Sequence, residues 1–454
     1  MHRQSSRAGR LLVGPFPGWS AVRQAGRPQH GSAAAATSDR YLTTIVSPDS
    51  SPRPGCARRA RPARAKIGGM SARIATGLAR TDAGVDSFAE AASRAALQLG
   101  GAPADLAVVF AGAANLGHAE EGLAAVQDRL HARALLGCGA QGVVGDGREL
   151  EEGGVVVWAA SLPGAEIETF HLETVPTSET AVAVAGMPEL DGADAAIVLV
   201  DPYTFPIDAV LAQLADDQPG LPVVGGLASA GGPRMAVLMH DDEVARRGAV
   251  GVALSSVDVR VCVSQGARPI GPEMAITAAE GNVIHELASQ RALERLRTAI
   301  AELDPGERAL ASQGLLVGIV IDPNRPEYER GDFLIRALIG VDEESGSLTV
   351  GERVRVGQTV RMQVRDGASA HEDLREALDR ELRSLGGPPA GALVFTCNGR
   401  GSHMFETPDH DASEIERAFS GAPAAGFFCA GEIGPVGDRN FVHGFTATLA
   451  VFAA

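Results

Sequence analysis

Apolar runs recur in the same order three times along the chain. Each copy has a short apolar run, a helical stretch, a second apolar run containing glycine and a third apolar run, over residues 106–162, 195–256 and 391–452. The first run and the central glycine are marked by Val108 and Gly137, Val198 and Gly225, and Val394 and Gly426. Each interval fits one β-loop-α-β unit. The sequence therefore predicts an α/β (α+β) fold of layered mixed β-sheets with flanking helices, built from repeated β-α-β-β units in two halves.

Three Ser-x-x-Glu patterns predict helix starts, because serine and glutamate at this spacing form a capping box. They are Ser87 with Glu90, Ser369 with Glu372, and Ser413 with Glu416. The first and second apolar runs of each copy are apolar on both sides of the pleat, which is typical of strands covered on both faces. The third runs continue into segments that favour antiparallel pairing.

The pattern changes near residues 266–271. Residues 274–287 predict a strand, a turn and a second strand, and a helix is expected over 290–303. We place a domain boundary here, with an N-terminal domain over 70–288 and a C-terminal domain over 289–454.

Residues 1–69 have no periodic apolar pattern. They contain twelve Lys and Arg residues and two acids, and they are rich in Ala, Ser, Pro and Gly. This composition predicts a disordered basic tail. It also resembles a transit peptide, and a start at Met70 is the simpler interpretation.

The chain as a whole has a net charge of −16. Because the basic residues are concentrated in the tail, the body is strongly acidic, which argues against nucleic acid or an anionic membrane as a partner. Lys66 is the only lysine, so the body has no P-loop lysine, Schiff base or Ser-Lys dyad. No apolar run approaches the length of a transmembrane helix.

Five cysteines occur without CxxC spacing: Cys56, Cys138, Cys262, Cys397 and Cys429. This number and spacing argue against a disulfide framework or a structural zinc site and favour a reducing cytoplasm. Residues 137–142 fit GxGxxG, but a strand is expected after them where a dinucleotide site needs a helix. They are interpreted as a glycine turn that approaches a ligand or another strand.

Several phrases resemble one family. CNGRG at 397–401, CAGEIGPVG at 429–437 and the final HGFTATLAVF resemble the C-terminal half of FIST proteins. GCGAQG, GGLASAGG, MAITAAEGNVIHEL and GQTVRMQVRDG occur in the matching order before them. The resemblance covers roughly residue 74 to the end. It implies an intracellular sensory protein that binds a small ligand and signals through a protein partner.

The ligand site is expected in the glycine loops. The candidate residues are Gly137, Cys138, Gly139, Gly225, Gly226, Cys397, Asn398, Gly399, Arg400, Gly401, Cys429, Gly431 and Glu432. Arg400 could hold a ligand carboxylate through two N–H donors, or it could be a solvated loop arginine paired with an acid such as Glu406. Glu432 could bind a ligand amine or be the buried partner of Arg400. If both line one pocket, they would suit a zwitterion such as an amino acid.

Other chemistries are weighed against this interpretation. His403 and His443 could pair with Cys397 and Cys429 in a thiol-dependent enzyme, and Arg400 would lower the pKa of Cys397. We expect no enzyme activity and no metal, and we interpret His403, Asp409, His410 and Asp411 as a polar linker.

No cofactor is predicted, although the resemblance leaves haem open. The axial-ligand candidates are His118, His131, His171, His240 and His285. The sequence thus favours a cytoplasmic sensor of an amino-acid-like ligand or a carboxylate. The alternatives are a protein-recognition module, a haem-based nitric oxide sensor and a thiol-dependent enzyme using Cys397.

Overall fold

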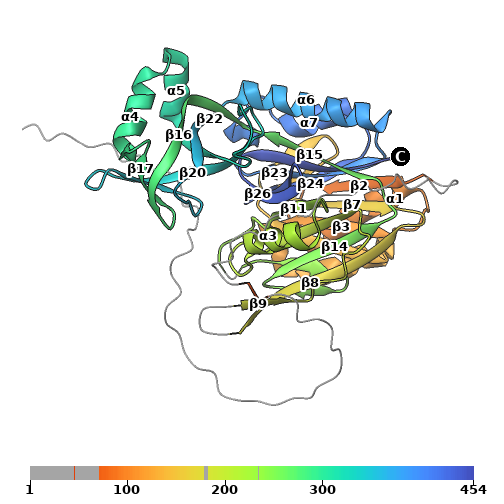
Figure 1. Cartoon of the computed structure of the whole chain (residues 1–454). Coiled ribbons are helices and arrows are strands. Elements are labelled where there is room, and N and C mark those ends of the chain that lie inside the picture. Colours follow the sequence, from red (N-terminus) through yellow and green to blue (C-terminus); the bar gives the residue numbers. More distant parts are fainter. Residues whose placement is uncertain (1–44, 47–70, 178–181, 234) are drawn as a thin grey trace, which may run out of the picture.

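The computed structural model describes residues 45–46, 71–177, 182–233 and 235–454, which form four β-sheets and their flanking helices (Figure 1). The mixed α/β architecture expected from the sequence is confirmed. The predicted basic tail lies outside the described residues, except for strand β1 (Ile45–Val46). This strand pairs with β9 (Val182–Ala185), and the disorder of the tail stays a prediction.

Three of the sheets each contain one copy of the repeat. The first has the order β13 (Glu243–Ala245), β12 (Leu238–His240), β4 (Ala134–Ala140), β3 (Leu106–Gly112), β7 (Val155–Ser161) and β2 (Arg73–Ala79). The second has the order β1, β9 (Val182–Ala185), β8 (Glu166–Pro176), β14 (Ala249–Ser255), β10 (Ala195–Val200), β11 (Val223–Leu227), β25 (Glu432–Val436) and β26 (Arg439–His443). The third has the order β15 (Val259–Gln265), β27 (Thr446–Phe452), β23 (Gly391–Cys397), β24 (Ala424–Cys429), β5 (Val143–Gly145) and β6 (Arg148–Leu150).

Each of these sheets has the same centre. A parallel pair is joined by one helix: β3 and β4 by α2 (Ala119–Leu130), β10 and β11 by α3 (Ile207–Asp217), and β23 and β24 by α7 (His410–Ala418). The third strand of the copy, β7, β14 or β27, then pairs antiparallel with the first. The repeated β-α-β-β unit is therefore confirmed.

The hairpin that follows each parallel pair joins a neighbouring sheet. β5 and β6 follow β4 in the chain, but β5 pairs with β24 of the third sheet. β12 follows β11 and pairs with β4 of the first sheet, and β25 follows β24 and pairs with β11 of the second. Each copy thus gives a hairpin to one neighbour and receives one from the other, and the three sheets form a closed ring.

Glycine occupies the same position in the second strand of every copy. The register partners are Gly137 with Val109, Gly225 with Val198, and Gly426 with Val394. A Cβ atom added to these glycines would lie 2.5, 1.9 and 1.7 Å from the partner carbonyl oxygen. No larger residue fits there without moving the strand. Gly137 and Gly225, predicted as ligand-loop residues, therefore lie inside strands.

This steric requirement gives a first testable prediction. We expect Gly426→Ala to lower the free energy of unfolding by about 1–3 kcal/mol, since overpacking displaces backbone in a buried strand. The measurement is the urea midpoint of the full chain. Gly117→Ala is the control, because no atom lies within 4 Å of its added Cβ. An unchanged midpoint for Gly426→Ala would show that the strand pair can separate freely.

The three sheets share one apolar core. Phe110 of the first sheet stacks on Phe427 of the third with 4.6 Å between ring centroids, and Phe395 meets Phe427 edge-on at 6.0 Å. Trp158 and Phe452 lie 5.0 Å apart in the same cluster. Aliphatic residues of the second sheet, such as Ile197, complete the cluster.

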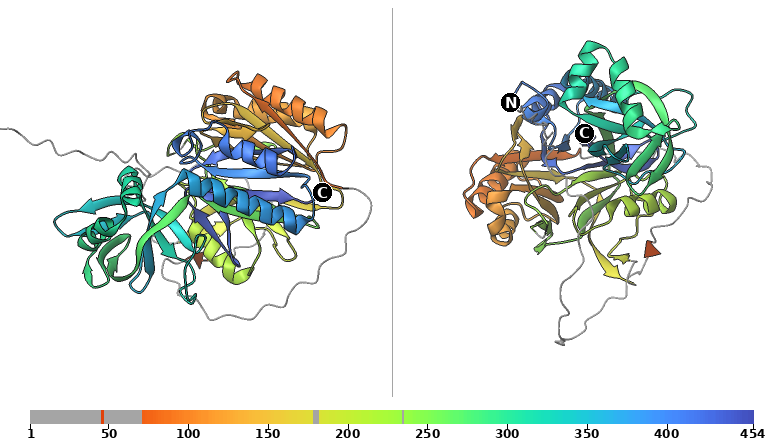
Figure 2. Two further views of the ribbon diagram at one scale, coloured as in Figure 1. Left: turned by 90° about the horizontal axis from the view of Figure 1, so that it is seen from above. Right: turned by 90° about the vertical axis from the view of Figure 1, so that its left-hand side faces the viewer.

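The fourth sheet is formed by one continuous segment. It has the order β16 (Ala267–Glu280), β22 (Thr359–Arg365), β19 (Leu315–Val320), β20 (Phe333–Asp342), β21 (Ser347–Val350), β17 (Val283–Leu287) and β18 (Gln290–Arg291). Helices α4 (Ala292–Glu302) and α5 (Pro305–Gln313) pack on it. This unit stands at one end of the molecule (Figure 2), and the predicted boundary between residues 288 and 289 falls inside it.

All three predicted capping boxes are wrong, although the helices exist. α1 (Val85–Leu99) begins after Gly84, and α6 (Gly367–Leu385) is capped by Asp366, whose side chain accepts from the Ala368 N–H. α7 begins after Asp409. Each predicted N-cap serine lies inside the first turn of its helix. The Ser-x-x-Glu pattern misled the prediction, since it also occurs within helices.

Candidate functional site

The predicted glycine loops meet at one end of the ring. The Asn398 N–H donates to the Cys429 carbonyl at 3.0 Å, and β11 receives β25 so that Gly226 pairs with Glu432. An added Cβ on Gly226 would lie 2.4 Å from the Cys429 sulfur. The first copy also reaches this end, since the Ser229 N–H donates to the Gly139 carbonyl at 3.2 Å. Candidate residues from all three copies therefore lie side by side.

Arg400 is completely buried and paired with Asp411. Its Nε donates to Asp411 Oδ2 at 2.6 Å and its Nη2 donates to Oδ1 at 2.8 Å. This corrects both predictions of its partner, which were Glu406 and Glu432. The bidentate face that was expected to hold a ligand carboxylate is occupied by the protein itself.

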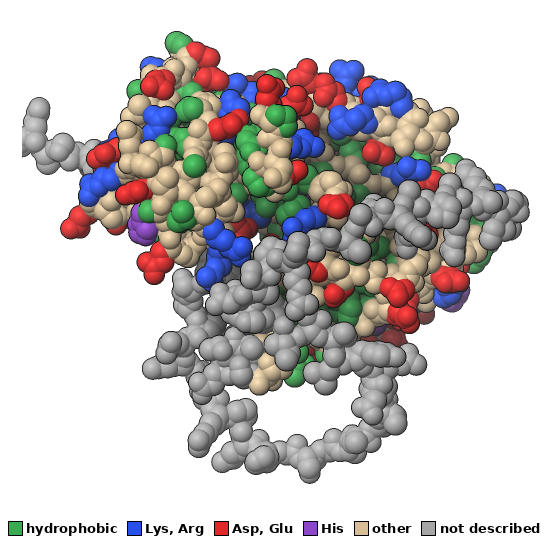
Figure 3. All heavy atoms as spheres, viewed as in Figure 1, with side chains coloured by type: hydrophobic (Ala, Val, Ile, Leu, Met, Phe, Trp, Pro, Cys, Tyr) green, Lys and Arg blue, Asp and Glu red, His purple; other side chains and the backbone are tan. Residues whose placement is uncertain are grey.

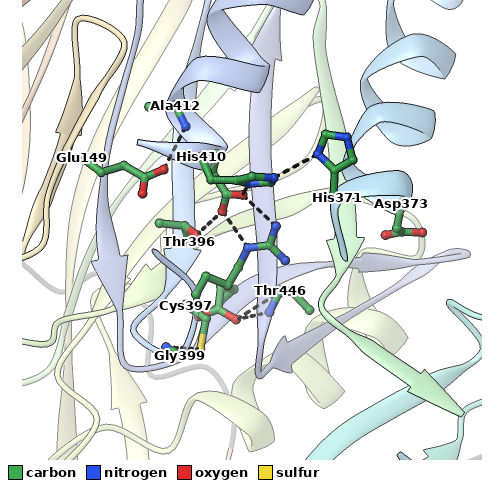
Figure 4. Close-up of polar contacts among 12 residues, drawn as sticks. Glu149, His371, Asp373, Thr396, Cys397, Gly399, His410, Ala412 and Thr446 are labelled. Atoms are coloured by element: carbon green, nitrogen blue, oxygen red, sulfur yellow. Dashed lines mark hydrogen bonds and ion pairs between the residues drawn. The ribbon is translucent and has the colours of Figure 1, made fainter. Parts of the chain in front are cut away.

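Asp411 is the centre of a buried polar network (Figure 4). Thr396 donates to Asp411 Oδ2 at 3.0 Å, and His410 Nδ1 lies 2.9 Å from Oδ1. His410 Nε2 lies 3.0 Å from His371 Nδ1 on α6, so the network reaches a second helix. Burial favours a higher Asp411 pKa, but the charge and hydrogen bonds of Arg400 outweigh burial and hold the pKa well below its usual range.

The polar-linker interpretation of residues 403–411 is therefore wrong in part. His410 and Asp411 form the first turn of α7 and face inward, and the His410 ring stacks on Phe405 with 3.5 Å between centroids. The guanidinium carbon Cζ of Arg400 lies 5.2 Å from the centroid of the Phe405 ring. Only His403 and Asp409 keep the loop positions that the sequence predicts.

Glu432 is the second buried charge-bearing residue. Its Oε2 accepts from the Thr446 hydroxyl at 2.8 Å and from the Thr446 N–H at 3.2 Å. The side chain is fully buried, and burial raises the pKa of its carboxyl to about 8. The thiol of Cys397 lies against this carboxyl.

Each of these two side chains keeps one atom without a partner. Arg400 Nη1 and Glu432 Oε1 are both buried and have no hydrogen-bond partner, and neither does Oδ1 of the adjacent Asn398. Native proteins seldom leave buried polar atoms unpaired, so such atoms are candidates for contact with a ligand or ion. Here a donor is left on Arg400, three positions after the end of β23, and an acceptor on Glu432, the first residue of β25.

The residues equivalent to Arg400 in the other two copies have hydrogen-bond partners. Arg400 lies six residues after Val394, the register partner of Gly426. At the same distance from the equivalent valine, the first copy has Asn115 and the second has Thr204. Asn115 Oδ1 accepts from the Gly84 N–H at 3.1 Å, and its Nδ2 donates to Asp82 at 3.0 Å. Thr204 donates to Asp201 at 2.5 Å. The protein satisfies these polar groups, and only the third copy leaves charged side chains incompletely paired at this position.

Two family models match the chain in tandem. The FIST N domain model matches residues 105–290, and the FIST C domain model matches residues 292–435. The uncharacterized protein Rv0628c of Mycobacterium tuberculosis (strain H37Rv) is 46% identical over 366 residues, which are 80% of this chain and 95% of that protein. The uncharacterized protein Mb0898c of Mycobacterium bovis is 44% identical over 382 residues, 84% of this chain and 98% of its own length.

The chain belongs to the FIST family. FIST domains are generally associated with small-ligand sensing in signalling proteins. Within this FIST protein, the unpaired atoms of Arg400 and Glu432 lie in the segment that the FIST C domain matches.

The thiols of Cys397 and Cys429 are not activated in this FIST protein. Burial raises the pKa of both thiols, and the carboxyl of Glu432 raises them further. The prediction of a lowered Cys397 pKa is therefore wrong, because burial and Glu432 outweigh any effect of Arg400. His443, which was considered as a partner, directs Nε2 to the Gly434 carbonyl at 3.0 Å.

Within residues 45–46, 71–177, 182–233 and 235–454, no cluster of three His, Cys, Asp or Glu side chains could hold a metal ion. The haem hypothesis stays a prediction. Among its candidate ligands, His171 on β8 of the second sheet and His240 on β12 of the first sheet have ring centroids 6.5 Å apart.

Charged side chains of both signs cover the surface of this FIST protein. Figure 3 shows them interspersed on the face that it presents. None of the helices in the described part of the chain is long and apolar enough to cross a membrane.

Proposed function

We propose that this FIST protein is a sensor that binds a small amino-acid-like molecule at the carboxyl ends of β23 and β24. The observation that carries the proposal is the pair of buried unpaired atoms, Arg400 Nη1 and Glu432 Oε1. A zwitterion matches this pair, because its carboxylate accepts from Nη1 while its ammonium group donates to Oε1. The ammonium charge would favour the ionised form of the Glu432 carboxyl, whose pKa burial raises to about 8.

A simple carboxylate fits less well. It would satisfy Arg400 Nη1, but it has no ammonium group for Glu432 Oε1 and could pair with that atom only while the carboxyl keeps its proton. Leaving a buried acceptor unpaired costs about 1–3 kcal/mol. Of the two ligand classes expected from the sequence, we therefore propose the amino-acid-like one.

The cytoplasm is the proposed location. The four cysteines among the described residues, Cys138, Cys262, Cys397 and Cys429, are free and buried, as suits a reducing compartment. Signalling would pass through a protein partner, in keeping with the association of FIST domains with signalling proteins.

Thermal unfolding of the full chain with a panel of amino acids tests the proposal. A ligand at about a hundred times its dissociation constant stabilises the folded state by roughly 2.7 kcal/mol. We expect the shift in wild type and in Glu344→Gln, whose side chain is exposed in the turn between β20 and β21, and its loss in Glu432→Gln. Absence of a shift with every amino acid, or an unchanged shift in Glu432→Gln, would contradict the proposal.

A further inference from the structure

The proposed ligand site is closed in this structure, so a covering segment must move to admit a ligand. Arg400 and Glu432 have no solvent exposure. The segment that follows Arg400 is residues 401–409, which contains the short 3-10 helix η2 (Gly401–His403) and then turns before α7. Its Phe405 lies against the Arg400 guanidinium. We call residues 401–409 the cover loop.

The backbone at both ends of the cover loop is left-handed. Gly401 has a φ of 57° and Asp409 a φ of 56°. Within the loop, the N–H groups of Met404 and Phe405 both donate to the Gly401 carbonyl, at 3.0 and 2.9 Å. The loop therefore contains a hydrogen-bonded turn and has a residue in the left-handed region at each end.

Residues 148–151, which are strand β6 and the residue directly after it, contact both ends of the cover loop. At the first end, Glu151 accepts from the Ser402 N–H at 2.6 Å and from the Ser402 hydroxyl at 2.5 Å. At the second end, Asp409 accepts from the Glu149 N–H at 2.7 Å and pairs with Arg148 at 2.8 Å. These holding residues come from the N-terminal half of the chain, more than 250 positions away.

We propose that the cover loop is a lid over the ligand site and that residues 148–151 of the N-terminal half latch it closed. This inference rests on the proposed function, since a lid has meaning only over a binding site. The two bonds of Glu151 to Ser402 and the pair of Arg148 with Asp409 are exposed, and the bond from the Glu149 N–H to Asp409 is part-buried, whereas the pair of Arg400 and Asp411 is fully buried. They can therefore break while the base of the site stays intact. The N-terminal half would then set how often the C-terminal site opens.

Hydrogen exchange of the full chain without ligand tests the latch. Glu151→Ala removes both hydrogen bonds to Ser402, and we expect the amides of Met404 and Phe405 to exchange about tenfold faster, the effect of roughly 1.4 kcal/mol. Ser402→Ala removes only the hydroxyl bond and should give a smaller increase. The control is Glu152→Ala, an exposed neighbour of Glu151.

Alkylation of the buried thiols with iodoacetamide gives the second readout. We expect Cys397, beside the site, to react faster in Glu151→Ala, while Cys262 under α6 keeps its wild-type rate. Equal rates in Glu151→Ala and Glu152→Ala would overturn the latch, as would equal acceleration of both thiols, which means global opening. A latch that fails with amino-acid binding intact would leave the sensor proposal standing, because neither readout uses ligand.

Discussion

Replacing Arg400 by alanine is expected to lower the free energy of unfolding by about 3–5 kcal/mol, because the substitution leaves the Asp411 carboxylate buried without its charged partner. Asp411 is 1% exposed and keeps only Thr396 and His410 as neighbours that bind it. The measurement is urea unfolding of the full chain near pH 7. The control is Arg417→Ala, whose pair with Glu414 is on the surface and is worth less than about 1 kcal/mol.

A double variant distinguishes the loss of the buried ion pair from the loss of side-chain packing. Arg400→Met with Asp411→Leu replaces both charges by apolar groups of similar size, and we expect it to recover most of the stability that Arg400→Ala loses. If Arg400→Ala has the same unfolding midpoint as Arg417→Ala, water reaches Asp411 and the site is more open than this structure shows.

The stability of the protein is expected to fall as pH rises from about 5 to 8. The folded-state pKa of Glu432 is about 8, above the value of roughly 4.3 for an unfolded chain. Between these two pKa values the folded state binds more protons than the unfolded state. The contribution of Glu432 to the free energy of unfolding is therefore fully present below the unfolded-state pKa and is lost as pH rises through the folded-state pKa. One such group contributes a slope of up to about 1.4 kcal/mol per pH unit.

Glu432→Gln isolates this contribution. Glutamine keeps the acceptor that Thr446 requires and cannot ionise, so the slope between pH 5 and 8 should decrease. It should not vanish, because burial and the charge of Asp411 also raise the pKa of Glu149 to about 8. Urea midpoints at four pH values provide the test, with exposed Glu406→Gln as the control. An unchanged slope in Glu432→Gln would mean that Glu432 is ionised in the folded state throughout this range.

The elements of the fold could be predicted because their signals are local. The apolar runs of each copy and the close approach of glycine to the neighbouring strand recur at similar spacing, so Gly137, Gly225 and Gly426 mark equivalent positions in one sequence. The exchange of hairpins could not be predicted. Whether β5 pairs with the strand before it or with β24 depends on contacts across more than 280 positions.

The sequence singled out Arg400 and Glu432 but not the residues that contact them. Arg400 and Glu432 stood out because charged residues beside apolar runs are rare. Their true partners did not, since Asp411 lies among polar residues that read as a linker and Thr446 looks like an ordinary strand residue. One signal was available: Ala412 and Ile415, at helical spacing, place Asp411 at the start of an amphipathic helix. Which oxygen or nitrogen atom lacks a partner depends on geometry that no spacing contains.

The exchanged hairpins also bear on how this architecture could change in evolution. A linear repeat array has end members, and it can gain or lose a copy if the ends are capped. Here every copy is both donor and recipient, so deleting one would leave a hairpin without a sheet and a sheet without a hairpin. Such a molecule is fixed at three copies. Diversity would then arise inside single copies, as when only one of the three acquired Arg400, Asp411 and Glu432.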